Sequence, residues 1–324
     1  MDFTTIKTLI GDDLNKVGVI TKECLKSECF LLDKINEYLL DSRGKRIRPT
    51  LALLTAKACG KMTDLSLHCA VVSEMIHTAT LLHDDVADNS NSRRGSPTVK
   101  ILFSSASSVL TGDFWLAKAL SLISESNDMK ALSFFTRAVD ELAEGELLQL
   151  QKTTTLDTTE EDYISIISRK TSSLFIAAIG SAVYASGADS LTIERMMQYA
   201  YHLGIAFQIK DDIFDYMPNL DTGKKAGTDI REKKITLPLI YALANASSEE
   251  RTRMVEAIRE SNSEDDTLPV KALDFIENFG GLASARLTLD SHIDKAIALL
   301  EPIPDTPYKQ QLISITHYVG DRNI

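Results

Sequence analysis

Helical periodicity runs through nearly the whole chain and restricts the possible folds more than any other feature. Apolar residues recur at spacings of three and four, and no convincing alternation of apolar and polar residues marks a strand. Gly (15) and Pro (8) are scarce, which long helices tolerate better than turn-rich β architectures do. We therefore expect an all-α protein whose helices include Leu31–Leu40, Leu65–Val86, Ala106–Ser124, Lys130–Leu150, Tyr163–Ala185, Ile193–Phe214 and Leu282–Leu300.

Helix boundaries and domain organisation follow from local signals. Thr158 with Glu161, and Ser247 with Glu250, have the spacing of capping boxes, which begin helices. Gly187 follows an apolar helix and is a plausible end for it. Because no linker rich in Pro, Ser or charge divides the 324 residues, we expect one domain over residues 1–324.

Charge and cysteine content exclude several classes of function. Lys and Arg total 35 against 46 Asp and Glu, so sequence-independent binding of nucleic acid phosphates is disfavoured. The four cysteines lack the spacing of metal-binding pairs and indicate reduced thiols. The N-terminus does not resemble a signal peptide, and the most apolar window, Leu174–Ala188, is too short to span a bilayer. These features favour a soluble cytoplasmic protein without a transmembrane segment.

An acidic motif of the form DDxxD occurs twice, each time at the end of an apolar helix. LLHDDVAD ends at Asp88, and FQIKDDIFD ends at Asp215. Residues four apart on a helix are neighbours, so the first and last Asp of each motif form a ridge, with the middle Asp about 100° away. Such carboxylates repel one another, and hard oxygen ligands suit Mg²⁺. The candidate metal ligands are Asp84, Asp85, Asp88, Asp211, Asp212 and Asp215.

Basic loops strengthen the interpretation of the acidic motifs as a binding site. A single DDxxD is as often a solvated helix end, but two copies after apolar helices are less easily explained in that way. The loops Asp41–Pro49, Asn89–Pro97 and Pro218–Lys234 are basic within an acidic protein. Mg²⁺ between acidic ridges, together with Lys and Arg, suits the binding and departure of a diphosphate group.

With these motifs, the sequence resembles the trans-polyprenyl diphosphate synthases. The resemblance implies the isoprenoid synthase fold, a single large helical bundle around a central cavity, and a homodimer. It further implies head-to-tail transfer between isopentenyl diphosphate and an allylic prenyl diphosphate, with transient membrane contact at product release. The motifs that carry it are Gly44–Pro49 (GKRIRP), Glu74–Gly95 (EMIHTATLLHDDVADNSNSRRG), Gly145–Leu150, Arg169–Phe175 (RKTSSLF), Phe207–Asp215, Gly223–Pro238 (GKKAGTDIREKKITLP) and His317–Arg322 (HYVGDR).

The resemblance also implies residue roles. Asp84, Asp88 and Asp211 would bind Mg²⁺ directly, and the other three Asp would complete ligation or hold metal-bound waters, with three ions per site when substrate is bound. The acceptor, isopentenyl diphosphate, would be bound by Lys45, Arg48, His77 and Arg94. The allylic diphosphate would be bound by Arg93, Lys170, Gln208 and Lys234, with Lys225 or Lys224 from the following loop. Thr171 and Gln208 would face the allylic cation, so the catalytic residues are Lys170, Thr171 and Gln208.

The chemistry of the residues supports these roles in part. Arg offers a planar two-pronged donor for phosphate oxygens, and Lys offers a point charge. His77 lies seven residues before Asp84, which places it about 20° away on an ideal helix, on the acidic face. His83 has no comparable argument in its favour. One departure from the family pattern is Lys233-Lys234, where the family usually has Gly-Lys before TLP.

Product length depends on the residues before the first acidic motif. In the family, bulky side chains four and five residues before it give short products, but Thr80 and Ala79 occupy these positions here. We therefore expect a long-chain product, and the stretch His77–Asp85 (HTATLLHDD) also resembles the long-chain members that make quinone side chains. One helical turn is about 5.4 Å, which is roughly the length of one isoprene unit. Deeper residues on the same helix would therefore meet successive units of the growing chain. The candidates are Val72, Met75 and Ile76 along the helix, and Phe134 with Phe135 or Phe114 with Trp115 at the floor.

Two alternatives remain open, and a third is disfavoured. The enzyme could make short farnesyl or geranylgeranyl products. It could be a non-catalytic subunit of a heteromeric prenyltransferase, although such subunits tend to lose the acidic ligands that this chain keeps. A terpene cyclase is disfavoured because Asp211, Asp212 and Asp215 repeat the first motif, and because Lys45 and Arg48 suit an isopentenyl diphosphate pocket.

Overall fold

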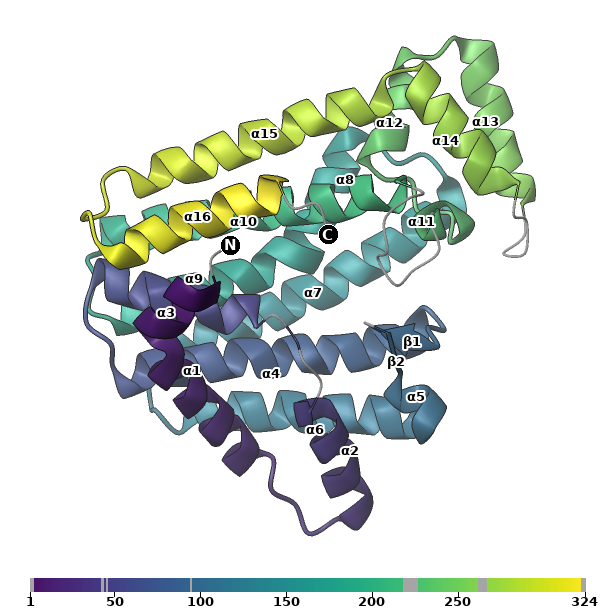
Figure 1. Cartoon of the computed structure of the whole chain (residues 1–324). Helices are drawn as coiled ribbons and strands as arrows, with labels where there is room; N and C mark the ends of the chain where they lie inside the picture. The colour runs from purple at the N-terminus through teal and green to yellow at the C-terminus, as the bar shows by residue number, and fades with distance from the viewer. Residues whose placement is uncertain are drawn as a thin grey trace. The chain divides into compact units, whose positions relative to one another are not determined.

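The computed structural model describes residues 3–41, 44, 46–93, 95–217, 227–261 and 267–321. These residues are almost entirely helical (Figure 1), which confirms the expected all-α class. The chain forms two compact units. The first unit comprises residues 1–139, 174–200 and 299–315, and the second comprises residues 140–173, 201–298 and 316–324. The expectation of one domain over residues 1–324 stays a prediction.

The first unit is built on two long helices, α4 and α6, which lie side by side (Figure 1). The Ser108 hydroxyl of α6 donates to the Leu82 carbonyl of α4 over 2.8 Å, and Trp115 Nε1 donates to Asn36 Oδ1 of α2 over 2.8 Å. The elements here are α1 (Phe3–Cys24), α2 (Phe30–Asp41), α3 (Ile47–Cys59), α4 (Asp64–Ala87), β1 (Ser92–Arg93), β2 (Ser96–Pro97), α5 (Val99–Leu102), α6 (Ser105–Ser124) and the start of α7 (Met129–Thr155). Most of α9 (Ser173–Ala185), the start of α10 (Ser190–Asp215) and most of α16 (Pro307–Asp321) also belong to it.

Among the described helices, α4 is the one that is long and apolar enough to cross a membrane. Most of its apolar stretch is buried inside the protein, and residues such as Val72 and Ile76 are fully buried. Burial by neighbouring protein removes the apolar surface that lipid would otherwise cover. The helix therefore has the character of a core helix.

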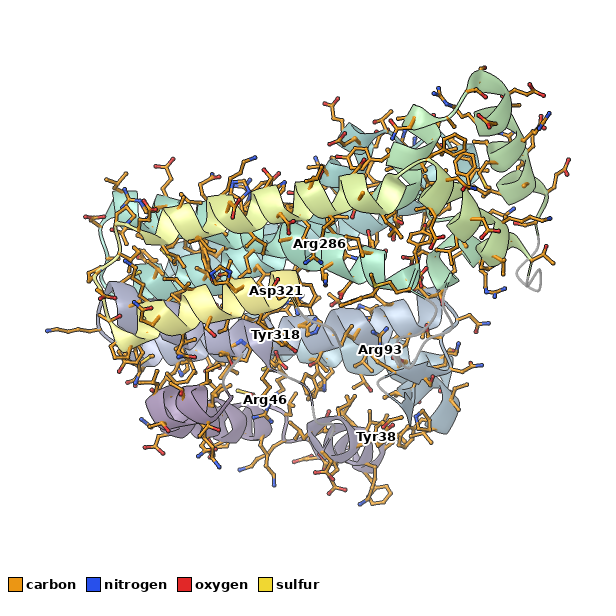
Figure 2. All side chains as sticks on the ribbon, turned by 45° about the horizontal axis from the view of Figure 1, so that its top comes forward. Tyr38, Arg46, Arg93, Arg286, Tyr318 and Asp321 are labelled. Atoms are coloured by element: carbon orange, nitrogen blue, oxygen red, sulfur yellow. The ribbon has the colours of Figure 1, made fainter. Side chains whose placement is uncertain are left out.

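The second unit contains the remaining halves of α7, α10 and α16 and a cluster of shorter helices. Its α14 packs against α11, α12 and α13. The Arg286 guanidinium lies 3.4 Å from Asp290 and 3.8 Å from Asp321. Figure 2 labels Arg286 and Asp321. The other elements are α8 (Glu160–Ile167), a π-helical turn η1 (Ser168–Ser172), α11 (Thr228–Arg231), α12 (Leu237–Asn245), α13 (Ser248–Glu260), α14 (Leu268–Asn278) and α15 (Gly281–Leu300).

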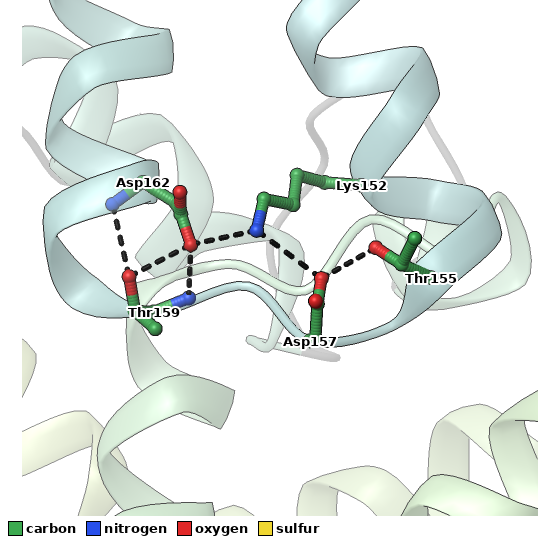
Figure 3. A network of polar contacts seen from close by, with 5 residues as sticks. All are labelled: Lys152, Thr155, Asp157, Thr159 and Asp162. Atoms are coloured by element: carbon green, nitrogen blue, oxygen red, sulfur yellow. Dashed lines mark hydrogen bonds and ion pairs between the residues drawn. The ribbon is translucent and has the colours of Figure 1, made fainter.

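One of the two expected capping boxes is shifted by a residue. Ser247 and Glu250 form the expected box at α13, but at α8 the box joins Thr159 to Asp162 rather than Thr158 to Glu161. Figure 3 shows the reason, because Lys152 Nζ lies 2.8 Å from Asp162 and 3.2 Å from Asp157. A cation reaching across the α7–α8 turn favours the register that presents Asp162 to it. Gly187 ends α9 in a left-handed conformation (φ 83°), as expected.

The expected single helix over Tyr163–Ala185 is interrupted. The π-helical turn η1 separates α8 from α9, and at its end the N–H of Ser173 donates to the Ser168 carbonyl, five residues back. A π turn inserts one residue into an α-helix without changing its apolar pattern strongly, so periodicity does not reveal it. The interruption falls on Lys170 and Thr171, two of the predicted site residues.

Candidate active site

The first acidic motif ends α4, and its three carboxylates occupy different environments. Asp85 is 4% exposed, whereas Asp84 is partly exposed and Asp88, at the helix end, is exposed. Burial raises the pKa of the Asp85 carboxyl, and the neighbouring Arg93 guanidinium opposes that rise. The predicted ridge therefore consists of two accessible carboxylates beside one buried carboxylate.

Arg93 reaches Asp85 because the chain turns back after α4. Asn89 adopts a left-handed conformation (φ 51°), and the short antiparallel hairpin β1–β2 follows. The hairpin, which the sequence did not reveal, sets Arg93 Nε 2.8 Å from Asp85 Oδ1. Figure 2 labels Arg93 on this segment. One predicted diphosphate ligand thus also orients a predicted metal ligand.

Two of the four predicted acceptor-binding residues, Arg48 and His77, lie among the described residues. Arg48 lies in the first turn of α3, and its guanidinium carbon lies 4.8 Å from the centre of the Phe175 ring, a cation–π distance. His77 is partly exposed on α4, where its carbonyl accepts from the Thr80 hydroxyl over 2.9 Å. Lys45 and Arg94 lie outside the described residues. Within the first unit, the helices that carry Arg48 and His77, α3 and α4, pack against each other.

The predicted length-determining positions lie on α4 and on helices of the same unit. Ala79 is 1% exposed and Thr80 is partly exposed, while Val72, Met75 and Ile76 are fully buried. Of the candidate floor residues, Phe135 and Trp115 are buried, and Trp115 is held by Asn36. Phe114 lies beneath Lys118, and Phe134 packs against Tyr184. Their role in product length stays a prediction.

The second acidic motif ends α10, and again its middle carboxylate is buried. Asp212 is 4% exposed; its Oδ2 accepts from the Tyr163 hydroxyl over 2.6 Å, and its Oδ1 accepts from Gln208 Nε2 over 2.8 Å. Burial raises the pKa of Asp212 to about 7, although both hydrogen bonds act in the opposite direction. Tyr163 comes from α8 and was not predicted, since nothing in the sequence pairs it with a residue 49 positions later.

The last Asp of this motif holds the start of α11. Asp215 accepts from the backbone N–H groups of Thr228 and Asp229 over 3.1 and 2.9 Å, at the start of α11. Asp211 is partly exposed. Lys234 Nζ lies 2.6 Å from Glu232 Oε2, and Lys224 and Lys225 lie outside the described residues. The carboxylate therefore anchors the chain that carries Lys234.

The three predicted catalytic residues lie in two hydrogen-bonded groups, one containing Thr171 and Gln208 and the other containing Lys170. The Thr171 hydroxyl donates to Gln208 Oε1 over 2.7 Å, and Gln208 continues to Asp212. Lys170 Nζ lies 2.8 Å from Gln149 Oε1 and 2.6 Å from Glu146 Oε1, both on α7. The sequence grouped Glu146 and Gln149 within a motif without giving them a role. The structure adds them as the partners that orient Lys170.

The donor set of both motifs fits a hard divalent cation. Oxygen ligands from carboxylates are those that Mg²⁺ prefers, and Asp211 and Asp215 each raise the pKa of Asp212 through like-charge repulsion, which a cation would relieve. Within the described residues, no three His, Cys, Asp or Glu side chains are already gathered around one point. Asp85, Asp212 and Asp215 instead make the contacts given above.

Comparison with known proteins identifies the family. The polyprenyl synthetase family model matches residues 30–275. The chain is 36% identical to octaprenyl diphosphate synthase of Escherichia coli over 324 residues, covering all of both chains. A decaprenyl diphosphate synthase from Rhodobacter capsulatus has the same fold, with a TM-score of 0.92, 35% identity and 98% of each chain covered.

A second solved structure is a polyprenyl synthase from Caulobacter crescentus complexed with calcium and isoprenyl diphosphate. It matches with a TM-score of 0.91 and 34% identity, covering 99% of this chain and 98% of that one. The agreement extends from the sequence motifs to the fold over the full length. This chain belongs to the polyprenyl synthetase family.

Proposed function

We propose that this protein is a Mg²⁺-dependent prenyltransferase that condenses isopentenyl diphosphate with an allylic diphosphate to make a long-chain all-trans polyprenyl diphosphate. The observation that carries the proposal is the pair of acidic helix ends, each with a buried, hydrogen-bonded middle Asp beside partly exposed carboxylates. Full-length similarity to octaprenyl and decaprenyl diphosphate synthases supports both the activity and the long product.

The residues divide into two substrate-binding sets. Arg48 and His77, with Lys45 and Arg94, would bind isopentenyl diphosphate. Arg93, Lys170 and Lys234, with Lys225, would bind the allylic diphosphate, because guanidinium and ammonium groups make charge-assisted hydrogen bonds to phosphate oxygens. Calcium and isoprenyl diphosphate are bound by the Caulobacter relative, which supports a divalent cation next to a diphosphate here. A complement of three Mg²⁺ ions is part of the proposal.

Asp84, Asp88 and Asp211 would hold Mg²⁺ directly, with Asp85, Asp212 and Asp215 in support. Bound Mg²⁺ would supply positive charge that stabilises the departing diphosphate. Lys170 and Arg93 add fixed positive charge where the leaving oxygens accumulate negative charge. The allylic C–O bond breaks with its electron pair leaving on oxygen, the isopentenyl double bond attacks the allylic carbon, and one proton is lost to the diphosphate.

Gln208 and Thr171 have a different task, which is to face the allylic cation with oxygen atoms. Thr171 donates its hydroxyl proton to Gln208 Oε1, and Gln208 donates its amide to Asp212. These two hydrogen bonds use the hydroxyl proton of Thr171 and an amide proton of Gln208. The lone pairs of the Thr171 hydroxyl oxygen can therefore face a positive charge. No protein nucleophile is needed for this reaction.

We also propose a cytoplasmic homodimer that supplies quinone side chains. Cys24, Cys29, Cys59 and Cys69 are free thiols, which suits a reducing compartment. Apolar side chains are exposed on α5 and α6, including Ile101 at 52% and Leu110 at 66%, and a second copy would remove such surface from water. Sedimentation should give twice the chain mass for the wild type, and Leu110→Lys should shift it toward one chain mass.

The deciding experiment is a product assay. Purified protein is incubated with isopentenyl diphosphate and farnesyl diphosphate, with Mg²⁺ or with excess chelator, and the products are separated by chain length. Products longer than geranylgeranyl diphosphate that require Mg²⁺ support the proposal, and products of that length or shorter favour the short-chain alternative. Asp88→Asn should abolish product, whereas Asp113→Asn, an exposed carboxylate on α6, serves as the matched control.

The same assay separates an enzyme from a non-catalytic subunit. Two bacterial relatives, at 31% and 28% identity, carry the name heptaprenyl diphosphate synthase component 2, so dependence on a second chain is a specific alternative. Turnover by the purified chain alone excludes that alternative. Absence of product both with and without Mg²⁺ would refute the proposal for the isolated chain.

A further inference from the structure

The π-helical turn η1 is closely approached by two helices, in each case at a glycine. A Cβ atom added to Gly145 of α7 would lie 2.9 Å from both Arg169 Cβ and the Lys170 backbone nitrogen. A Cβ atom added to Gly204 of α10 would lie 2.6 Å from Ser172 Oγ and 2.7 Å from Ser172 Cα. All four separations are shorter than 3.0 Å, closer than non-bonded heavy atoms come without a shift of one of them. Any larger residue at either position would therefore push its helix away from the turn.

Each glycine lies one helical turn before the residue that holds a catalytic side chain. Residues four apart share a helix face, so Gly145 is followed on its face by Gln149, and Gly204 by Gln208. Gln149 accepts from Lys170 Nζ over 2.8 Å, and Gln208 accepts from the Thr171 hydroxyl over 2.7 Å. The two helices thus use the same arrangement, in which a glycine gives close approach and a glutamine makes the hydrogen bond.

The π turn itself needs such support. Its i to i+5 bonding, seen between Ser173 N–H and the Ser168 carbonyl, is a poorer geometry than the α-helix offers. The Ser173 hydroxyl donates to the Arg169 carbonyl over 2.5 Å, which occupies an acceptor within the turn. Ser172 Oγ is fully buried and has no hydrogen-bond partner among the described residues, so the contact with α10 is retained at some cost.

We propose that Gly145 and Gly204 are positioning residues, which set α7 and α10 close enough to the π turn for Gln149 and Gln208 to hold Lys170 and Thr171. The inference rests on the proposed function, because the roles of Lys170, Thr171 and Gln208 do. Its consequence is that one added methyl group, making no contact with substrate, lowers the rate of the chemical step. Binding of isopentenyl diphosphate, assigned to the other residue set, is left unchanged.

The test compares Gly204→Ala and Gly145→Ala with a sterically matched control in the same full-length protein. At Gly60 an added Cβ would lie 2.4 Å from the Ser186 carbonyl oxygen and 2.7 Å from Ser186 Oγ, so Gly60→Ala produces an overlap at least as severe, away from the π turn. Single-turnover rates with farnesyl diphosphate are measured at a temperature at which circular dichroism shows every variant folded. Gly204→Ala and Gly145→Ala should lower the rate by about tenfold to a hundredfold with an unchanged KM for isopentenyl diphosphate, and Gly60→Ala should not.

A rescue variant and a second readout make the outcome decisive. Ser172→Gly removes Oγ and Cβ, two of the three atoms that the Cβ added by Gly204→Ala would meet, and leaves Cα at 2.7 Å, so the double variant should regain part of the activity. Hydrogen exchange of the segment 165–175 should be faster in Gly204→Ala than in wild type and should recover in part in the double variant. Unchanged rates, or losses equal to that of Gly60→Ala, overturn the inference.

The two proposals fail in distinguishable ways. If the wild type shows no Mg²⁺-dependent transfer, the proposed function is refuted, while the hydrogen-exchange comparison still reports whether the glycines position the turn. If the wild type is active and exchange in residues 165–175 is unaffected by Gly204→Ala, the positioning role alone is refuted.

Discussion

Lys233 is held in a backbone conformation that suits glycine, and replacing it should stabilise the protein. The residue follows α11 with φ 58°, in the left-handed region, and its N–H donates to the Ile230 carbonyl over 3.1 Å. This is the position at which the family usually has glycine before lysine. The Cβ of an L-residue crowds the following carbonyl in this region, and glycine has no Cβ.

The size of the effect follows from the contacts. The left-handed conformation costs an L-residue roughly 1–2 kcal/mol, and the additional freedom of glycine in the unfolded chain offsets roughly 0.5–1 kcal/mol of that gain. The Lys233→Gly variant also loses the exposed hydrogen bond that Lys233 Nζ donates to the Arg259 carbonyl over 2.9 Å. Such a bond contributes about 0.5 kcal/mol at the surface, the low end for an intramolecular hydrogen bond. We expect Lys233→Gly to be more stable than wild type by about 0.5 kcal/mol.

The matched control is Lys233→Ala, which removes the same amino group but keeps the Cβ. Because both variants lose the Arg259 contact, their difference isolates the backbone term, and glycine should exceed alanine by about 1 kcal/mol. Urea unfolding monitored by circular dichroism measures both values. Equal stabilities, or a more stable alanine variant, would refute the assignment of strain to Lys233.

Three further predictions concern the second unit and product length. Burial and the neighbouring His202 and Lys295 lower the pKa of His292 from 6.5 to about 4; the unfolded chain therefore binds the proton more readily, and stability falls as pH drops from about 6.5 to 4. His292→Gln should flatten that decline by about 1–2 kcal/mol in urea titrations, whereas His317→Gln, at an exposed site, should not. Hydrogen bonds from Lys152 and Thr159 lower the pKa of Asp162 to about 2, so its contribution is present above pH 3.8 and is lost as pH falls through 2. Asp162→Asn should cost about 1 kcal/mol at neutral pH after allowance for its partial exposure, and an equal cost for Glu161→Gln would contradict the Thr159 register. Ala79→Phe should shorten the product in the chain-length assay, and an unchanged distribution would exclude Ala79 from the tunnel.

The helices were largely predictable because their signals are local. Apolar spacing and the scarcity of Gly and Pro gave α4, α6 and α10 to within a few residues of their observed ends. The α8 cap was misplaced because TxxE from Thr158 and TxxD from Thr159 satisfy the same pattern, and Lys152, outside it, decides between them. The left-handed conformation of Lys233 explains why its departure from the family pattern matters, although sequence alone gave only the departure.

The contacts that complete the candidate site depend on distant segments. A helical wheel places Asp212 about 100° from Asp211 but does not say what lies opposite, which proves to be Tyr163 from α8. The hairpin that returns Arg93 to Asp85 has two-residue strands, too short to produce an alternating pattern. The resemblance assigned roles to Lys170, Thr171 and Gln208, and the last two share a hydrogen bond. The partners of Lys170, which are Glu146 and Gln149, needed the structure.

The two copies of the acidic motif are alike in sequence and burial but differ in electrostatics. Asp85 and Asp212 are each 4% exposed, and burial raises the pKa of both carboxyls. Asp85 receives its hydrogen bond from a guanidinium, whose charge favours the ionised carboxylate. Asp212 receives two hydrogen bonds from neutral groups and lies beside two further carboxylates, so its pKa remains near 7. Since the motif itself is identical, the difference arises from the partner each copy meets, a charged hairpin residue in one case and a buried phenol and amide in the other.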